Sequence, residues 1–248
     1  MNDRLQNRLN DLGKYLYSLE SSIALLALGS CAETSRMDEY SDLDFFLIVK
    51  EGTKKEFLID LDWCEAIAPL AYSFRNTIDG YKVMWKDGIY AEFAIFECEE
   101  LPSIAYSPGR FIFKKKGYEL SNQPTRKIQE LRQQDLSYAL NEILTNLYVG
   151  LGRYRRGEVL SAHRLICVHA VDRYLSILPL LDEPTDALID PFALDRRVEF
   201  RHPLMKEKLS TFVKDYDHVL DAAKAMVDEL QKISSINETL LLEINKLI

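Results

Sequence analysis

The chain has 248 residues, of which 47% are hydrophobic and 28% are charged, and its formal net charge is −8. This composition suits one large or two small globular domains and excludes a disordered chain. Its longest apolar runs fall far short of the roughly 20 residues of a membrane span, and its N-terminus lacks a signal-peptide pattern. We therefore expect a cytoplasmic protein with reduced cysteines, and charge repulsion disfavours a nucleic-acid polymer as its partner.

The first half of the chain predicts a mixed α/β fold. Leucines recur at helical spacing through residues 2–19, which predicts an amphipathic helix. A second helix is expected at about 53–68. Asp-Gly dipeptides at 79–80 and 87–88 favour tight hairpins. Short apolar runs predict strands at 22–29, 43–49, 71–78, 81–86, 89–96 and 110–114.

The second half of the chain predicts helices alone. Helical periodicity marks about 124–154, 158–181 and 204–232, whereas residues 182–203 are expected to form a long loop with one short helix. A Pro-bearing segment at 121–124 suggests a domain boundary. We therefore expect a catalytic α/β (α+β) domain of residues 1–122 with a mixed sheet. An all-α helical bundle of residues 123–248 would follow and help to form an acceptor pocket.

Two aspartates lead into the second predicted strand. Burying an unpaired carboxylate costs roughly several kcal/mol, so acids at the start of a core strand need a compensating charge, commonly a metal ion. Side chains alternate along a strand, which places Asp42 and Asp44 on one side and Leu43 toward the core. Two such carboxylates, roughly 6–7 Å apart, can bracket one or two Mg²⁺ ions. The pair is therefore predicted to be a metal site.

Two further features extend this prediction. Gly29 and Ser30 end the preceding strand, where a phosphate can approach bare backbone and meet N–H groups of a helical start. Glu92 lies mid-strand between apolar Ala91 and Phe93, so it faces away from both. Glu92 is predicted to hold a second metal ion or to take the proton of an acceptor. The alternative for Glu92 is an edge strand with a wet outer face.

A second Asp-x-Asp pattern helps to test how specific the first one is. Asp60 and Asp62 fall in the helix expected at 53–68, where side chains at i and i+2 diverge by about 200° and cannot share a metal ion. We predict solvated charges there. Glu97 and Glu142 are the next candidates for the third acid should Glu92 not fill that role.

The stretch GSCAETSRMDEYSDLDFFLIV, residues 29–49, resembles the signature of the DNA polymerase β-like nucleotidyltransferase superfamily. In that signature Gly-Ser is followed by Asp-x-Asp on the next strand. The order of an α/β half and a helical half is similar to the antibiotic-modifying branch, above all the lincosamide and, more distantly, the aminoglycoside nucleotidyltransferases. The strong match covers about residues 23–96.

The resemblance implies roles for individual residues. Gly29 and Ser30 would contact a nucleoside triphosphate, Asp42 and Asp44 would bind Mg²⁺, and Glu92 would be the third carboxylate of the metal site. Many members carry a small residue, a basic residue and Gly soon after Gly-Ser, and this chain does not. Two further nucleotide contacts are therefore assigned, to Arg36, in place of the missing basic residue, and to Ser41.

The function expected from these residues is Mg²⁺-dependent nucleotidyl transfer by a protein that binds ATP or another nucleoside triphosphate. A nucleoside monophosphate would pass from a triphosphate to a hydroxyl of a small molecule, and the resemblance implies a lincosamide or aminoglycoside antibiotic, as in antibiotic resistance. An antitoxin-like or a protein- or RNA-modifying protein of the same fold is the alternative. The sequence does not identify the acceptor, the nucleobase or the oligomeric state. A homodimer is one of the oligomeric states that it allows.

Overall fold

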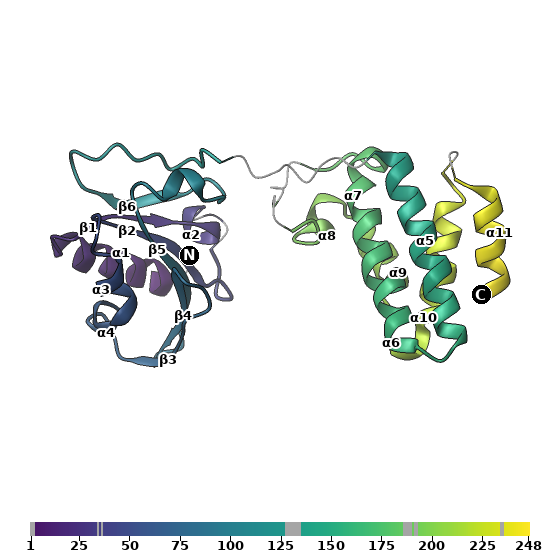
Figure 1. Cartoon of the computed structure of the whole chain (residues 1–248), viewed down its shortest axis with the longest axis horizontal. Coiled ribbons are helices and arrows are strands. Elements are labelled where there is room, and N and C mark those ends of the chain that lie inside the picture. Colours follow the sequence, from purple (N-terminus) through teal and green to yellow (C-terminus); the bar gives the residue numbers. More distant parts are fainter. Residues whose placement is uncertain are drawn as a thin grey trace. The chain divides into compact units, whose positions relative to one another are not determined.

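The computed structural model describes residues 3–33, 35, 37–126, 135–185, 190, 193–233 and 236–248. The chain divides into two compact units, residues 1–127 and 128–248. Figure 1 shows a sheet with helices in the first unit and helices in the second. The predicted fold class, an α/β half with a mixed sheet followed by a helical half, is therefore confirmed.

One mixed sheet organises the first unit. The strand order is β3-β4-β5-β2-β1-β6, with β2 and β5 parallel and the other neighbours antiparallel. All six predicted strands are present, with shifts of a few residues at their ends. The strands are β1 (Ser22–Ala27), β2 (Leu43–Val49), β3 (Leu70–Phe74), β4 (Gly80–Trp85), β5 (Tyr90–Glu97) and β6 (Arg110–Lys114).

Helices cover one face of this sheet. The leucines of α1 (Asp3–Ser18) are buried, as their spacing predicts. Together with apolar residues of α3 (Lys54–Ile59) and α4 (Asp62–Glu65), they pack on alternate strand residues such as Phe45 and Phe93. The opposite face has a smaller apolar cluster, which includes Ile48, Phe96 and Leu101 of the short turn η2 (Leu101–Ser103). The carboxylates described below lie on this second face.

The prediction of one helix at 53–68 is wrong in part, because the helix is interrupted between α3 and α4. Asp60 is extended, with φ −128° and ψ 132°, and its Oδ1 accepts a hydrogen bond of 2.8 Å from the backbone N–H of Asp62. Short polar side chains that bond their own backbone compete with helix continuation. Asp60 is thus not a helix residue, although both aspartates are exposed as expected.

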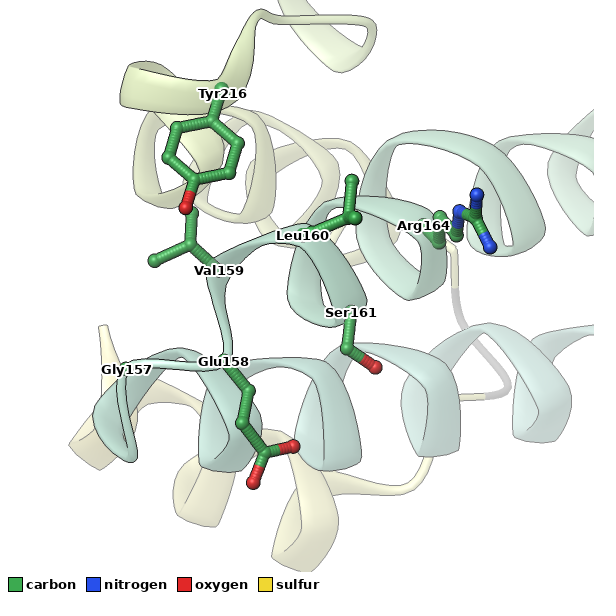
Figure 2. A pocket seen from close by; sticks show the side chains of 7 residues that line it. All are labelled: Gly157, Glu158, Val159, Leu160, Ser161, Arg164 and Tyr216. Carbon is green, nitrogen blue, oxygen red and sulfur yellow. The ribbon is translucent and has the colours of Figure 1, made fainter.

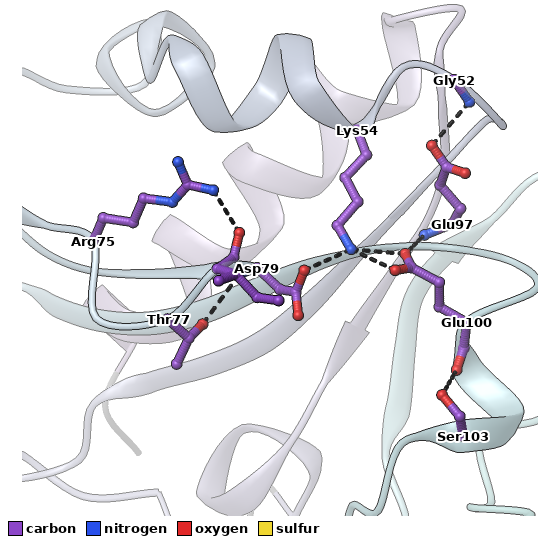
Figure 3. Close-up of polar contacts among 9 residues, drawn as sticks. Gly52, Lys54, Arg75, Thr77, Asp79, Glu97, Glu100 and Ser103 are labelled. Atoms are coloured by element: carbon purple, nitrogen blue, oxygen red, sulfur yellow. Dashed lines mark hydrogen bonds and ion pairs between the residues drawn. The ribbon is translucent and has the colours of Figure 1, made fainter.

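A half-buried lysine, Lys54, connects three segments of the first unit. Lys54 Nζ lies 2.7 Å from Asp79 Oδ1 and 2.6 Å from Glu100 Oε1, and its side chain is only 13% exposed (Figure 3). It also lies 5.1 Å from the centre of the Phe96 ring. Glu97 turns to the backbone N–H of Gly52, at 2.8 Å. These contacts fix the far end of β5 and the β3–β4 turn.

The second unit is helical throughout its described elements and has its own apolar core. Helix η3 is a π-helix that continues from α6 into α7, so the helix expected at 158–181 is confirmed. The elements are α5 (Leu136–Arg155), α6 (Val159–His163), η3 (Arg164–Ala170), α7 (Val171–Leu181), α8 (Val198–Arg201), α9 (Met205–Phe212), η4 (Tyr216–His218), α10 (Val219–Leu230) and α11 (Glu238–Leu247).

Two predicted helices of this half are wrong in their extent. The helix expected at 124–154 does not include residues 124–126, and residues 127–134 lie outside the described part. The helix expected at 204–232 is interrupted at 213–215, where Asp215 instead accepts a hydrogen bond from Asp217 N–H. Within the described ranges, no helix combines the length and apolar character that crossing a bilayer requires.

We predict that Lys54→Ala destabilises the first unit by about 1–2 kcal/mol, because Asp79 and Glu100 lose the cation that they share. Burial lowers the pKa of Lys54, but its hydrogen bonds to Asp79 and Glu100 outweigh burial and hold the pKa above 10.5. The stabilisation is therefore complete below pH 10.5 and is lost as the pH rises beyond it. Urea unfolding at pH 8 and pH 11 measures both effects.

Lys55→Ala is the matched control, since Lys55 is the exposed next residue of the same helix. It should leave the free energy of unfolding within about 0.5 kcal/mol of wild type. Equal losses in the two variants would contradict a special role for Lys54.

Candidate functional site

The two predicted aspartates lie at the start of β2. Asp44 is the second residue of the strand and is half-buried, while its neighbours Leu43 and Phe45 are buried against the helices. Asp42 comes directly before the strand and is also half-buried. By strand alternation both acids project to the face away from α1, α3 and α4. This is the arrangement that the sequence predicts.

Glu92 stands beside Asp44 on the next strand. The parallel register of β2 and β5 pairs Asp44 with Glu92, and the antiparallel register of β4 and β5 pairs Glu92 with Lys82. Residues paired in this way point to the same face, with strands about 4.8 Å apart. Lys82, Glu92 and Asp44 therefore form one row of charged side chains across three strands.

Glu92 contacts two polar side chains on this face. Lys82 Nζ lies 3.2 Å from its Oε2, and Asn76 Nδ2 donates to its Oε1 at 2.8 Å. The hydrogen bond and charge of Glu92 raise the pKa of Lys82, and the charges of Tyr90 and Asp42 add to this effect. Asp42 therefore belongs to the same electrostatic neighbourhood as Lys82 and Glu92.

Gly29 leaves room for the Asp44 carboxylate. Its φ is +52°, a conformation that residues with a Cβ rarely adopt. A Cβ at this position would lie 2.8 Å from Asp44 Oδ2, closer than a real contact permits. The backbone is joined here as well, because Leu28 N–H donates to the Asp44 carbonyl at 2.8 Å. The Gly29 backbone and the Asp44 carboxylate are thus in direct proximity.

Two residues that the sequence did not predict hold this turn in place. Cys31 is buried in the short helix α2 (Gly29–Ala32), and its thiol donates to the Asp42 carbonyl at 3.3 Å. Arg110 of β6 donates from Nη2 to the Cys31 carbonyl at 2.8 Å and to Gln6 Oε1 at 3.2 Å. The turn is therefore attached to β2 on one side and to β6 on the other.

The Cys31 thiol is not a nucleophile at neutral pH. Burial raises its pKa to about 11, and the charges of Asp44 and Asp42 contribute to the rise. A thiol with such a pKa stays protonated near pH 7, whereas the thiolate is the reactive form. We assign Cys31 a structural role under the two aspartates.

The predicted nucleotide contacts differ in where they lie. Ser30 is half-buried in α2, next to Gly29. Ser41 closes a local turn, since its Oγ accepts from Asp38 N–H at 2.9 Å and donates to Asp38 Oδ1 at 3.0 Å. Arg36 lies outside the described residues. The structure thus brings Gly29 and Ser30 to the aspartates and gives Ser41 a partner within its own loop.

The donor set is compatible with Mg²⁺ but is not assembled around one. Among the described residues, no group of three or more His, Cys, Asp or Glu side chains is arranged to hold a metal ion. Asp42 and Asp44 supply carboxylate oxygens, the ligands that Mg²⁺ prefers, on one face. Glu92 lies in register with them but is paired with Lys82 and Asn76. Two carboxylates therefore fit, and Glu92 adds a third only by leaving Lys82.

A hollow in the helical unit has a different character. It measures about 400 Å³ and is lined by residues 157–161, Arg164 and Tyr216 (Figure 2). In Figure 2 the Glu158 carboxylate points away from Tyr216 and Val159. Glu158 pairs with Arg156 at 3.1 Å, so this hollow offers no pair of free carboxylates among its described lining residues. We do not place metal-dependent chemistry there.

No protein-family model and no curated protein matches the chain. Solved structures do. An aminoglycoside 6-adenyltransferase from Bacillus subtilis is 12% identical, with 98% of this chain and 90% of that chain covered and a TM-score of 0.34. A spectinomycin adenyltransferase from Enterococcus faecialis, with ATP and spectinomycin, is 18% identical, with 98% of each chain covered and a TM-score of 0.32.

The CCA-adding enzyme of Thermotoga maritima, complexed with tRNA, is 12% identical, with 99% of this chain and 70% of that chain covered and a TM-score of 0.41. By their names all three neighbours transfer nucleotides, which is the class that the Gly-Ser and Asp-x-Asp motif predicts. At these identities and scores the likeness carries no argument about substrate or mechanism. The case for a function therefore depends on this chain's own residues.

We predict that Gly29→Ala destabilises the protein by about 2 kcal/mol or more, because it adds a contact with Asp44 to the strain of a left-handed backbone. It should also displace the Asp44 carboxylate and so abolish any stabilisation of the protein by Mg²⁺ and a triphosphate. Thermal unfolding with and without 5 mM Mg-ATP measures both effects.

Gly52→Ala separates the two causes. Gly52 has φ +77°, but no atom lies within 4 Å of a Cβ placed there. This variant should lose only about 1 kcal/mol and keep its response to Mg-ATP. Indistinguishable behaviour of the two variants would refute the proximity of Gly29 and Asp44.

Proposed function

We propose that this protein is a Mg²⁺-dependent nucleotidyltransferase that moves a nucleoside monophosphate from a nucleoside triphosphate to a hydroxyl of a small molecule. One observation carries the proposal. The Asp44 carboxylate lies against the bare backbone of Gly29, and Asp42 and Glu92 share its face of the sheet. A phosphate-accessible turn and paired carboxylates are the two parts that metal-assisted phosphoryl chemistry needs side by side.

Asp42 and Asp44 would hold the metal ion. Bound Mg²⁺ would neutralise charge on the triphosphate and on the departing pyrophosphate. Gly29 and Ser30 would approach the phosphates from the end of β1, one with its backbone and the other with its hydroxyl. The attachment of their turn through Cys31 to Arg110 keeps it at a fixed distance from Asp44. Arg36 and Ser41 remain predicted nucleotide contacts.

Glu92 is the proposed proton acceptor. It would take the proton of the acceptor hydroxyl while that oxygen attacks the α-phosphorus. The bond from the α-phosphorus to its bridging oxygen then breaks, and pyrophosphate leaves. Lys82 Nζ, which lies 3.2 Å from Glu92 Oε2, would keep a positive charge near the reacting phosphates. Glu97 is directed to Gly52 at the other end of β5, and Glu142 lies 3.8 Å from Arg173 in the helical unit, so Glu92 is preferred.

The acceptor class is the finer part of the proposal. A net charge of −8 favours a cationic acceptor over a polyanion. Lincosamide and aminoglycoside antibiotics are the candidates that the sequence resemblance suggests. The expectation that residues 123–248 help to bind the acceptor stays a prediction.

The test incubates the protein with Mg²⁺, each of ATP, GTP, CTP and UTP, and a panel of lincosamides and aminoglycosides. Mass spectrometry then detects an added nucleoside monophosphate, and a coupled assay detects released pyrophosphate. Label appearing on protein or RNA in cell extract, with no small-molecule product, would replace the small acceptor by a macromolecular one. An absence of pyrophosphate with every acceptor would overturn nucleotidyl transfer itself.

We predict that Asp42→Asn and Asp44→Asn each lower transfer by at least about 10³-fold, since both lie at the site proposed for the metal ion rather than in the apolar core. Their melting temperatures without ligand should stay close to wild type. The rate of pyrophosphate release measures the loss. Asp60→Asn and Asp62→Asn, which alter the exposed second Asp-x-Asp, should keep wild-type rates. Near-normal turnover in either strand variant would remove the proposed metal site.

We predict that Glu92→Gln slows the chemical step by about 10²–10⁴-fold with little change in triphosphate affinity, as expected of a general base. Lys82→Gln is its control, because it also breaks the Lys82–Glu92 pair but keeps the carboxylate. Single-turnover kinetics should show a much smaller effect in Lys82→Gln. A fall in Mg-triphosphate affinity in Glu92→Gln would instead identify Glu92 as a metal ligand.

A further inference from the structure

Edge strand β3 exposes aromatic side chains on the face that carries the carboxylates. Tyr72 is 50% exposed and Phe74 is 52% exposed. The antiparallel register of β3 and β4 pairs Tyr72 with Met84 and Phe74 with Lys82. Since Lys82 forms an ion pair with Glu92, the side chains of this register lie on the carboxylate face.

The sheet register extends this relation into two parallel rows. The first row crosses four strands as Phe74, Lys82, Glu92 and Asp44. The second row runs beside it as Tyr72, Met84 and Tyr90, and Asp42 follows next to Tyr90 by continuation of the β2–β5 register. Each row thus begins with an aromatic ring at the edge and ends with an acid at the centre of the sheet.

The spacing between strands gives the size of a molecule that would span these rows. Neighbouring strands are about 4.8 Å apart, so Phe74 and Glu92 are separated by about 10 Å at the backbone. A molecule of one or two saturated rings covers that distance. A ring lying on Tyr72 and Phe74 would therefore extend a hydroxyl as far as Glu92.

We propose that Tyr72, Phe74 and Met84 form the binding platform for the acceptor, a hydroxylated ring compound that lies with its non-polar face on these side chains. The proposal rests on the nucleotidyl transfer proposed above, because it uses Glu92 as the group that receives the hydroxyl proton. Exposed aromatic rings gain from covering such a surface. The acids Glu92 and Asp42 add a favourable field for an ammonium group on the same compound.

Asn76 supports the position of Glu92 at the inner end of the platform. It lies two residues after the end of β3 and donates to Glu92 Oε1, so the turn after Phe74 folds back over the acid. Asn76 Oδ1 is buried and has no hydrogen-bond partner among the described residues. A hydroxyl or ammonium group of an acceptor bound beside Glu92 would donate the hydrogen bond that Asn76 Oδ1 lacks.

A second copy of the chain is the other candidate occupant of β3. Strand addition would use the backbone edge of β3 and would leave Tyr72 and Phe74 exposed on the sheet face. The aromatic side chains lie on the face instead, in continuous rows with the carboxylates. The acceptor is therefore the occupant that the register favours, and dimer formation is an outcome that the test distinguishes.

The experiment compares wild type with the double variant Tyr72→Ser/Phe74→Ser. Saturation-transfer NMR with lincomycin, kanamycin and spectinomycin detects binding without turnover. We expect ring C–H signals with at least one of these compounds in wild type and their loss in the double variant. In the transfer assay the KM for that compound should rise about tenfold or more, while stabilisation by Mg-ATP stays unchanged.

Two controls accompany the double variant. Ile59→Ser removes an 82% exposed apolar side chain on α3, which packs on the opposite face, and should bind as wild type does. Tyr72→Phe/Phe74→Tyr keeps the rings and should restore the KM. Size-exclusion chromatography with light scattering follows the oligomeric state of each variant.

The outcomes separate this proposal from the proposed function. A wild-type KM in the double variant, with transfer still dependent on Asp42, overturns the platform and leaves nucleotidyl transfer standing. Binding of a ring compound that needs Tyr72 and Phe74, without any pyrophosphate release, overturns the transfer but keeps the platform. Wild-type protein that binds no member of the panel, or a dimer that the double variant dissolves, overturns the platform.

Discussion

The parallel pairing of β2 with β5 is the constraint on which the site depends. A parallel pair needs a long crossover, and here the segment from α3 to β4 supplies it. The register of this pair sets Asp44 beside Glu92, and a shift by one residue would turn Glu92 into the core and Phe93 out of it. The apolar contact of Phe45 with Phe93, at 5.1 Å between ring centres, holds that register from the other face. Apolar packing on one face of the sheet thus fixes the positions of Asp44 and Glu92 on the other face.

Much of this site can be predicted from the sequence, because the alternation of side chains along a strand depends only on neighbouring residues. Asp42, Asp44 and Glu92 each interrupt or lead an apolar run, and their flanking residues Leu43 and Phe93 are buried as predicted. The Gly-Ser turn is equally local, since it ends one strand and begins a short helix. What alternation cannot supply is which strands become neighbours, and therefore which side chains meet.

The missed residues show this limit. Lys82 reaches Glu92 only through the β4–β5 register, and Arg110 reaches Cys31 across 79 positions of the chain. Neither has a local pattern that distinguishes it from an ordinary strand residue.

The interruptions of the predicted helices were missed for another reason. At Asp60 and Asp215 a side chain bonds the backbone N–H two residues on, and this local competition overrides an otherwise helical apolar spacing.

The hydrogen bond from Arg110 to the Cys31 carbonyl also makes completion of the site depend on the last strand of the sheet. The turn at Gly29 leaves the ribosome early, but β6, which pairs with β1 and carries Arg110, is the last strand of the sheet to be made. Long-range pairing of this kind is slow, since the intervening chain must close as a loop first. A nascent chain that ends between Glu97 and Arg110 therefore has both aspartates and Glu92 yet lacks the hydrogen bond from Arg110 to the turn. Premature termination between β5 and β6 would yield a fragment with the complete motif and an unfinished site.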